Sequence, residues 1–472
     1  MSLTKVSNSM QNSAPFSVTD YYAAGDADDT ASFNRAILAA ALQGSGTVIA
    51  PPTKTYTVAS KILICANVEI DLGGSTINGS LSSTMFESGY LSGDALVTNI
   101  GTGNETHTLY GCKVYNGVIQ NSLLAFNVFN FLSNCSVSEI RFNQCAKAVY
   151  ANRSFYSSWT NLTSSNEGGL QYAGIPGFTF YDNVNAMTIS GVRSGHRDTG
   201  MYIRGPVFQT VIDNCQIENG VTGIIVENET FAFEVRNCYF ENLSGISLDM
   251  TYAAQKTNTV VDNNFFHSLG VAIKGQLLIE GYIGSGNSYS GPSTNVWITD
   301  DLYSSITVYA NSTGGADNAT GALPSTYVLG KKVQVQGFSN IYRTSDGMPL
   351  ISSLSPSKLL NFNHVGDAGS IGANQIDFCT SASTGGATFN VVIDTSITHQ
   401  STANLLAFNF TIVDNVGSYH IFGNVYGDTV KQQDTSGKTV TLTAPGGLVV
   451  LSASSFSHPS GTFGATGVVR HV

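Results

Sequence analysis

Two successive stretches of the chain, Thr210–Asn228 (TVIDNCQIENGVTGIIVEN) and Glu234–Thr251 (EVRNCYFENLSGISLDMT), are near copies of each other. Each contains Asn-Cys, a short apolar element, Glu-Asn, a glycine and a second short apolar strand. A unit of this size that recurs in register is the sequence signature of a repeat architecture. The two copies therefore predict a fold built from stacked repeats.

The repeat extends along the chain in both directions. The apolar residues that precede each turn are spaced by 23, 23 and 26 residues, at Ile189, Ile212, Val235 and Val261. Fainter copies occur in VSEIRFNQCAKAVYAN (137–152) and SWTNLTSSNEGGLQY (158–172). A leucine-rich repeat would show a leucine framework, and a propeller would need longer repeats. Repeats of this length with three short strands each predict an all-β fold, a right-handed parallel β-helix.

The turns of the repeat carry asparagines at matching positions, Asn214, Asn237 and Asn263. Asparagine favours turns, and stacked asparagine side chains can bond to each other and to the backbone. Seven cysteines are present without a CxxC pair or metal-type spacing. Cys215 and Cys238 fall at equivalent positions, which indicates buried free thiols, a chain folded in a cytoplasm, and no metal or cofactor.

Composition excludes several classes of protein. The 472 residues carry a net charge of -11, with 42% hydrophobic residues, 11% charged residues and 49 glycines. This hydrophobic content argues against disorder. The acidic balance argues against nucleic acid or an anionic membrane as partner, and no apolar run approaches the length of a membrane span. Neutral or mildly charged sugars are compatible partners.

We predict five regions along the chain. They are an N-terminal tail (1–15), a capping helix with the first strands (16–60), the β-helix (61–305), a turn-rich linker (306–354) and a C-terminal antiparallel sandwich or jelly roll (355–472). The helix is expected to begin at an N-cap made by Asp28, Asp29 and Thr30 and to end at Gly44 and Gly46. Such a helix would cover the exposed core of the first coil.

The segment VTDYYAAGDADDTASFNRAILAA (18–40), followed by GTVIAPPTKTYTV (46–58), resembles the opening of the pectate-lyase-3-like β-helix module of bacteriophage tailspikes and capsule depolymerases. Asp28–Thr30 and Pro51–Pro52 carry the match, whereas Tyr22 and Ala24 depart from the usual motif. The resemblance implies a homotrimer on the virion tail that binds, and usually cleaves, a bacterial surface polysaccharide. The family includes hydrolases, lyases and pure binders, so the fold leaves the reaction open.

Stacking the repeats converts sequence register into columns on the surface. The strand after each glycine is expected to point apolar side chains inward: Met201, Ile203, Ile224, Val226, Ile246, Leu248, Val271 and Ile273. At its outward end Arg204, Glu227, Asp249 and Lys274 are expected in line, about 4.8 Å apart. Glu227 and Asp249 would then be adjacent carboxylates, and this is our first candidate groove because related pectinase-like folds usually hold substrate there. The alternative is a salt-bridge ladder on a solvated face.

A second column, one strand earlier, places Glu218, Glu241 and His267 in line, after Gly195. Repulsion between stacked carboxylates tends to raise the pKa of one of them. Glycoside hydrolysis requires that combination of one acid and one ionised partner. The alternative is that these glutamates only bond backbone amides in the turns.

The loop SGHRDTGMYIRG (194–205) gathers His196, Arg197, Asp198, Tyr202 and Arg204. A Tyr, His or Arg base beside a cation is the arrangement that β-elimination of a uronic acid requires. Asp198 is a further candidate acid, and the other four, with Lys274, are candidate substrate-binding residues. The alternative is a loop whose charges pair among themselves.

Three hypotheses follow from these residues. The first is a phage tailspike, folded in the bacterial cytoplasm, that attaches to the tail or to another spike protein and hydrolyses capsule or O-antigen at paired carboxylates. The second is a polysaccharide lyase that uses His196, Tyr202 and Arg204. The third is a fibre that binds glycan without cleaving it.

Overall fold

The structure, a computed structural model, describes the chain in ranges separated by gaps. The described residues are 15–99, 107–165, 175–195, 198–252, 254–299, 303–310, 326–329, 333–337, 340–343, 349–351, 375–383, 388–394, 405–413, 418–426, 429–434, 439–443, 448–454 and 462–471. The predicted N-terminal tail lies outside them, apart from Pro15. The chain divides into two compact units, 1–273 and 274–472.

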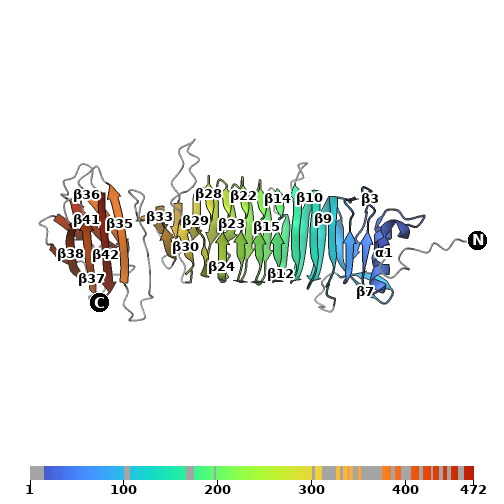
Figure 1. The fold of residues 1–472 in the computed structure, drawn as a ribbon, viewed down its shortest axis with the longest axis horizontal. Helices are drawn as coiled ribbons and strands as arrows, with labels where there is room; N and C mark the ends of the chain where they lie inside the picture. The colour runs from blue at the N-terminus through green and yellow to red at the C-terminus, as the bar shows by residue number, and fades with distance from the viewer. Residues whose placement is uncertain are drawn as a thin grey trace, which may run out of the picture. The chain divides into compact units, whose positions relative to one another are not determined.

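The first unit is a right-handed parallel β-solenoid (Figure 1). A regular coil consists of β17 (Val211–Asp213), β18 (Gln216–Glu218), β19 (Thr222–Glu227) and β20 (Thr230–Phe231). The preceding coil consists of β13 (Thr188–Ser190), β14 (Arg193–Gly195), β15 (Thr199–Arg204) and β16 (Val207–Phe208). Each strand pairs in parallel with its counterpart, so the fold prediction is confirmed. The predicted three strands per coil are corrected by a fourth short strand, β16 or β20.

The observed register confirms the predicted repeat steps. Ile189 pairs with Ile212, Ile212 with Val235, and Val235 with Val261. The following strands are β21 (Glu234–Arg236), β22 (Tyr239–Glu241), β23 (Ile246–Met250), β24 (Lys256–Asp262) and β25 (Phe265–His267). The earlier coils use longer strands that run through the corners, namely β9 (Lys113–Phe131), β10 (Ser136–Phe155), β11 (Ser158–Ser165) and β12 (Phe178–Asn185).

Asparagines turn the corners of the solenoid because they tolerate left-handed backbone. Asn214, Asn237 and Asn263 have φ of 51°, 53° and 55°. The expected bond between stacked asparagines lies one corner later, where Asn242 Nδ2 donates to Asn219 Oδ1 at 2.8 Å. Asn237 instead donates to Asp213 Oδ1 at 2.8 Å. The corners are thus set by backbone conformation first and by side-chain bonds second.

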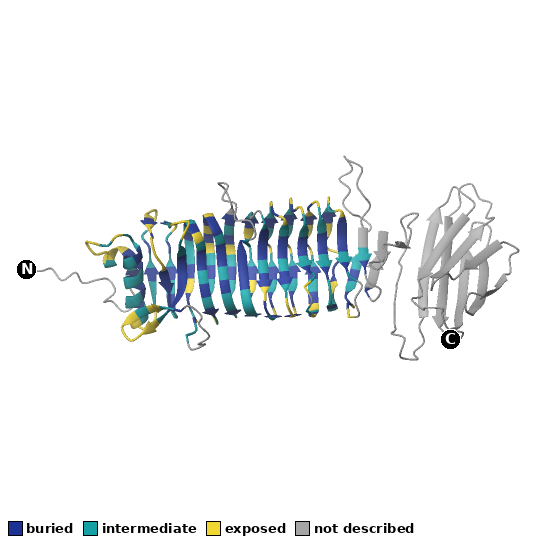
Figure 2. Ribbon diagram, turned by 180° about the vertical axis from the view of Figure 1, so that it is seen from behind, coloured by how far each residue is buried: buried dark blue, intermediate teal, exposed yellow. Residues whose placement is uncertain are grey.

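Buried positions recur along the strands of the solenoid (dark blue in Figure 2), and most of them are apolar residues that fill its interior. Phe240 and Phe266 on neighbouring coils lie 4.8 Å apart between ring centroids, with planes 7° from parallel. Six cysteines are buried free thiols, as expected: Cys65, Cys112, Cys135, Cys145, Cys215 and Cys238. Repetition therefore builds the core as continuous rows along the stack.

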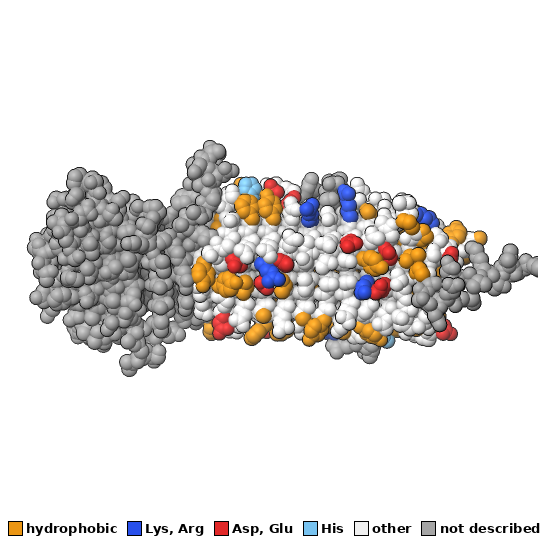
Figure 3. Space-filling model, viewed as in Figure 1, with side chains coloured by type: hydrophobic (Ala, Val, Ile, Leu, Met, Phe, Trp, Pro, Cys, Tyr) orange, Lys and Arg blue, Asp and Glu red, His pale blue; other side chains and the backbone are white. Residues whose placement is uncertain are grey.

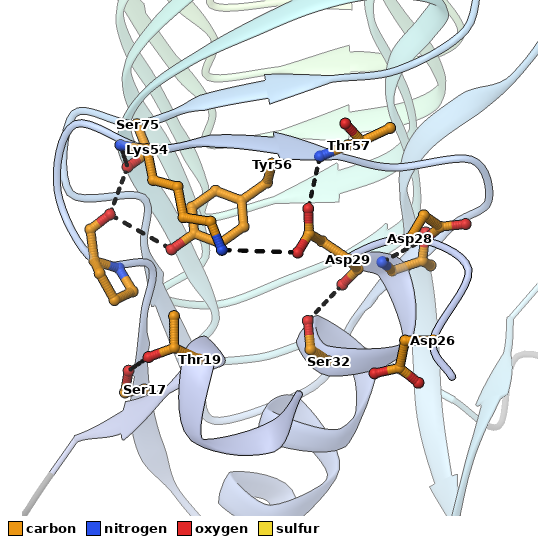
Figure 4. Close-up of polar contacts among 12 residues, drawn as sticks. Ser17, Thr19, Asp26, Asp28, Asp29, Ser32, Lys54, Tyr56, Thr57 and Ser75 are labelled. Carbon is orange, nitrogen blue, oxygen red and sulfur yellow. Dashed lines mark hydrogen bonds and ion pairs between the residues drawn. The ribbon is translucent and has the colours of Figure 1, made fainter. Parts of the chain in front are cut away.

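Helix α1 (Thr30–Leu42) packs on the first strands, where the Phe33 ring meets the Tyr56 ring edge-on at 5.2 Å. Figure 4 shows how its start is held. Asp28 Oδ1 accepts from the Thr30 amide at 2.7 Å, whereas the Asp29 carboxylate accepts from the Thr57 amide at 2.8 Å. The predicted N-cap is therefore corrected at Asp29, whose side chain bonds a strand instead of the helix.

The second unit contains further parallel pairs. Strand β27 (Leu278–Ile283) pairs with β30 (Thr307–Ala310), and β30 pairs with β32 (Gln334–Gly337). Likewise β29 (Thr294–Ile298) pairs with β31 (Thr326–Leu329), and β31 pairs with β33 (Asn340–Arg343). The range predicted as a turn-rich linker thus contains paired strands.

Two antiparallel sheets follow in this unit. The five-stranded sheet has the order β35 (Gln375–Ser383), β42 (Thr462–His471), β37 (Leu405–Val413), β38 (Ser418–Tyr426) and β39 (Thr429–Asp434). The three-stranded sheet has the order β36 (Thr388–Asp394), β41 (Leu448–Ser454) and β40 (Thr439–Thr443). Among the described residues, no helix is long and apolar enough to cross a membrane.

Candidate functional site

Two outward columns lie side by side on the face formed by β18, β22 and β25. Glu218 pairs with Glu241 and Glu241 with His267, as the sequence predicts. In the adjacent column Gln216 pairs with Tyr239 and Tyr239 with Phe265. We call these six residues the carboxylate face. Their strands are neighbours in parallel register, so the two glutamates sit on consecutive coils.

The carboxylate face distinguishes its two glutamates electrostatically. Burial, followed by the charge of Glu241, raises the pKa of Glu218, and the charge of Arg193 opposes that shift. The Gln216 amide nitrogen donates to the Glu218 carboxyl. Burial and the two carboxylates also raise the pKa of the Tyr239 hydroxyl. The result is a carboxyl that retains its proton more readily, next to a second carboxyl one coil away.

Aromatic rings flank this pair. The Tyr239 and Phe265 rings stack 5.4 Å apart at 4°, and Phe265 lies 6.2 Å from the His267 ring at 12°. Phe265 is 38% exposed. Because the rings cover each other's faces, they present their edges to solvent and form an apolar rim along the carboxylates.

A second group of side chains surrounds Glu227. Arg204 pairs with Glu227 in register, as predicted, and its Nε lies 3.1 Å from Glu227 Oε2. The Tyr202 hydroxyl donates to the same oxygen. Burial and the Glu227 charge raise the pKa of Tyr202. Both donors thus bind the same carboxylate oxygen of Glu227.

The predicted line from Glu227 to Asp249 is wrong. Asp249 pairs with Ile225, 24 residues away, so Glu227 and Asp249 occupy different positions along their strands. The second copy carries one more residue between its Glu-Asn corner and its strand, and its glycine, Gly245, precedes the strand whereas Gly223 lies within it, so an alignment on the glycines shifts the register by two. For the same reason Ile246 is half-exposed while Ser247 and Leu248 are buried; Val271, also expected inward, is half-exposed. Asp249 instead accepts from the amide and the hydroxyl of Thr251, at 3.0 and 2.6 Å.

The remaining predicted residues do not join either group in the described structure. His196 and Arg197 lie outside the described residues. Asp198 is half-buried, and its main-chain oxygen accepts from the amides of Val221 and Thr222 in the next coil. Lys274 belongs to the second unit, where its Nζ lies 5.2 Å from the Trp297 ring centroid.

Several residues of these groups were absent from the sequence-based prediction. Tyr239 and Phe265 were detectable, because they precede the inward aromatic in NCYF and NNFF and alternation points them outward. Arg193 follows from the same register. Tyr150 and Tyr181 lie on long strands where the repeat is faint, so no clear signal marks them. In the part of the chain that the structure describes, no cluster of His, Cys, Asp and Glu is arranged to hold a metal.

Charged side chains are sparse on the described surface. Figure 3 shows them in small groups of mixed sign beside hydrophobic side chains, on the face turned to the viewer. This distribution agrees with the pairing of Glu227 with Arg204, of Asp182 with Arg153 at 3.1 Å, and of Glu69 with Lys113 at 2.6 Å.

Searches with the sequence found no matching family model and no matching curated protein. Solved structures similar to the chain include a tailspike protein of Acinetobacter baumannii bacteriophage Fri1, a capsular polysaccharide depolymerase, at 12% identity, 98% coverage of this chain, 86% of that chain and a TM-score of 0.36. PfbA, a surface adhesin of Streptococcus pneumoniae, has 14% identity and a TM-score of 0.49, and the match covers 74% of this chain and 98% of that chain. A tailspike mutant of E. coli bacteriophage HK620 in complex with pentasaccharide has 11% identity and a TM-score of 0.44, and the match covers 97% of this chain and 93% of that chain.

Proposed function

We propose that this protein is a polysaccharide depolymerase of the phage tailspike type, which hydrolyses a bacterial surface polysaccharide on the carboxylate face. One observation carries the proposal: Glu218 and Glu241 stack in register on consecutive coils, and the pKa of Glu218 is raised. The N-terminal motif that resembles capsule depolymerases supports it. So does the acidic surface, which suits a polymer without a strong negative charge.

The two glutamates divide the work of glycoside hydrolysis. Glu218, in its protonated form, donates its proton to the glycosidic oxygen as the bond to the sugar breaks. Glu241, in its ionised form, either removes a proton from water or attacks the anomeric carbon. The separation of the two carboxyls in the complex decides between these routes, at about 6.5–9.5 Å for inversion and about 5–5.5 Å for retention. The apolar rim of Tyr239 and Phe265 excludes water from one side of the bond.

The geometry favours this pair over the other candidates. Glu227 is already bound by the Tyr202 hydroxyl and by Arg204, and Asp249 is not in register with it. For β-elimination, Tyr202 would have to lose a proton that it donates to Glu227, and its raised pKa opposes that loss. Hydrolysis at Glu218 and Glu241 is therefore preferred to a lyase reaction at the Tyr202 side.

The test compares three carboxyl-to-amide variants on a panel of bacterial capsules and O-antigens. Glu218→Gln and Glu241→Gln should each lower the release of new reducing ends by about 10²–10⁴-fold, the usual contribution of a general acid or base. Glu234→Gln is the matched control, because that carboxylate pairs with Arg236 at 3.0 Å on another strand. Normal cleavage by both active-face variants would overturn the assignment. New ultraviolet absorbance from an unsaturated product would identify a lyase, and adsorption without cleavage would identify a binder.

The proposal extends to the assembly and the ends of the chain. The protein folds in the bacterial cytoplasm and forms a homotrimer on the virion tail, attached directly or through another spike protein. Helix α1 covers the open end of the first coil, consistent with the buried contact between Phe33 and Tyr56. The antiparallel sheets within 355–472 form a sandwich that trimerises the chain, binds carbohydrate, or both.

A further inference from the structure

Three tyrosines lie on consecutive coils, on β10, β12 and β15, and Glu227 on β19 extends the row to a fourth coil. Tyr150 pairs with Thr179 and Thr179 with Tyr202, which gives one column. Tyr181 pairs with Arg204 and Arg204 with Glu227, which gives the next column, two residues further along the strands. We call Tyr150, Tyr181, Tyr202, Arg204 and Glu227 the tyrosine face.

The members of the tyrosine face hold one another in a continuous chain of contacts. The Tyr150 and Tyr181 rings stack 6.1 Å apart at 23°. The Arg204 guanidinium lies 5.2 Å from the Tyr181 ring centroid and binds Glu227, which also accepts from Tyr202. Both tyrosines are half-buried, and the Tyr150 hydroxyl is hydrogen-bonded to the Asn152 side chain. Successive coils repeat at about 4.8 Å, which sets the spacing of this row along the solenoid.

The carboxylates in this region are each paired with an arginine. Glu227 is balanced by Arg204, and the nearby Asp182 is balanced by Arg153. The Lys147 ammonium lies against the Tyr150 ring, 5.2 Å from its centroid. Recognition here therefore depends on hydrogen bonds. A carboxylate offers about four acceptor sites and a guanidinium five donors, so Glu227 and Arg204 retain capacity after binding each other.

The tyrosine face is separate from the carboxylate face. They share the coil that carries β18 and β19; from there the carboxylate face extends to β22 and β25, and the tyrosine face extends to β15, β12 and β10. The left-handed corner at Asn219 stands between β18 and β19. A sugar bound at one face thus leaves the other face free. A polymer long enough to reach both faces would bind more tightly than a polymer that reaches only one.

We propose that the tyrosine face is a second, non-catalytic glycan-binding site, which holds the hydroxyl groups of sugar units aligned along the solenoid axis. The site rests on the proposed glycan specificity of the protein. It binds through the Tyr181 hydroxyl and through the remaining hydrogen-bonding positions of Arg204 and Glu227. Because its charges are paired, its affinity changes little with salt.

The experiment uses the full chain and an immobilised panel of bacterial surface oligosaccharides, with neutral and uronate-containing members. Binding is measured for the parent, Tyr181→Phe, Arg204→Gln and Phe231→Ala, all in a Glu218→Gln background. Tyr181→Phe removes one hydroxyl and should weaken binding about 2–10-fold. Arg204→Gln should weaken it at least tenfold, since a charged hydrogen-bonding partner is lost. The parent should bind equally at low and high salt.

Phe231→Ala is the matched control, because Phe231 is a 53% exposed aromatic on the separate strand β20. It should bind like the parent. The proposal is overturned if the parent binds no oligosaccharide, if Tyr181→Phe and Arg204→Gln bind like the parent, or if Phe231→Ala loses as much as they do. Failure of the proposed hydrolysis gives a different result. In that case Glu218→Gln still cleaves polysaccharide normally, while Tyr181→Phe still weakens binding.

Discussion

The pKa of Glu218 is set by burial and by two charged neighbours that can be removed one at a time. Burial and Glu241 raise the pKa, whereas Arg193 lowers it. Glu241→Gln should therefore lower the pKa of Glu218, and Arg193→Gln should raise it. Nuclear magnetic resonance titration of carboxyl-labelled glutamate measures both shifts. Equal pKa values in the two variants would show that the charges do not act on Glu218.

Lys256 gives a prediction of how the stability of the protein depends on pH. Its side chain is buried, its Nζ donates to the main-chain oxygens of Tyr252 and Ala254 at 2.8 Å, and burial lowers its pKa to about 8. The unfolded chain, with a value near 10.5, binds more protons than the folded chain between these limits. Stability from this residue therefore rises with pH from about 8 to about 10.5. Lys256→Met should lower the thermal midpoint more at pH 9.5 than at pH 7, and an equal loss at both pH values would contradict the burial of an ionisable amine.

Single elements of the solenoid depend on the left-handed corners. Asn237 has φ of 53° and ends β21. Asn237→Val should destabilise the protein by about 1–3 kcal/mol, because a β-branched side chain is strained in this conformation. Asn237→Gly keeps the conformation and loses only the exposed bond to Asp213, so it should cost less. Chemical denaturation of the two variants decides, and equal losses would place the effect in the side-chain bond.

The elements also show how far the sequence determines the fold and the site. Repeat spacing and alternation predicted the strands, the coil register at Ile212 and Val235, and the column of Glu218 and Glu241. They failed where a repeat changes length, because glycine-based alignment put Glu227 beside Asp249 while hydrogen bonding between strands places Ile225 there. Contacts that require three-dimensional packing, such as Arg204 on the Tyr181 ring, have no periodic signature.

At the scale of the whole molecule, the columns have meaning only because identical coils stack. Each coil contributes one residue to each column. A site that spans several coils is therefore built from one residue of each coil, and each of these residues can be replaced separately. The carboxylate face and the tyrosine face use this property on different strands, and they share the coil that carries β18 and β19. Loss of register in that shared coil would therefore disturb both faces together, whereas a point substitution disturbs one.

The oligomeric state of the protein can be predicted at the scale of the whole molecule. The N-terminal resemblance implies a homotrimer, and light scattering of the purified chain should give three times the 49.8 kDa of one chain. Each chain carries a net charge of -11, so subunits repel one another and association should strengthen as salt screens that charge. A mass of one chain at every salt concentration would contradict the trimer.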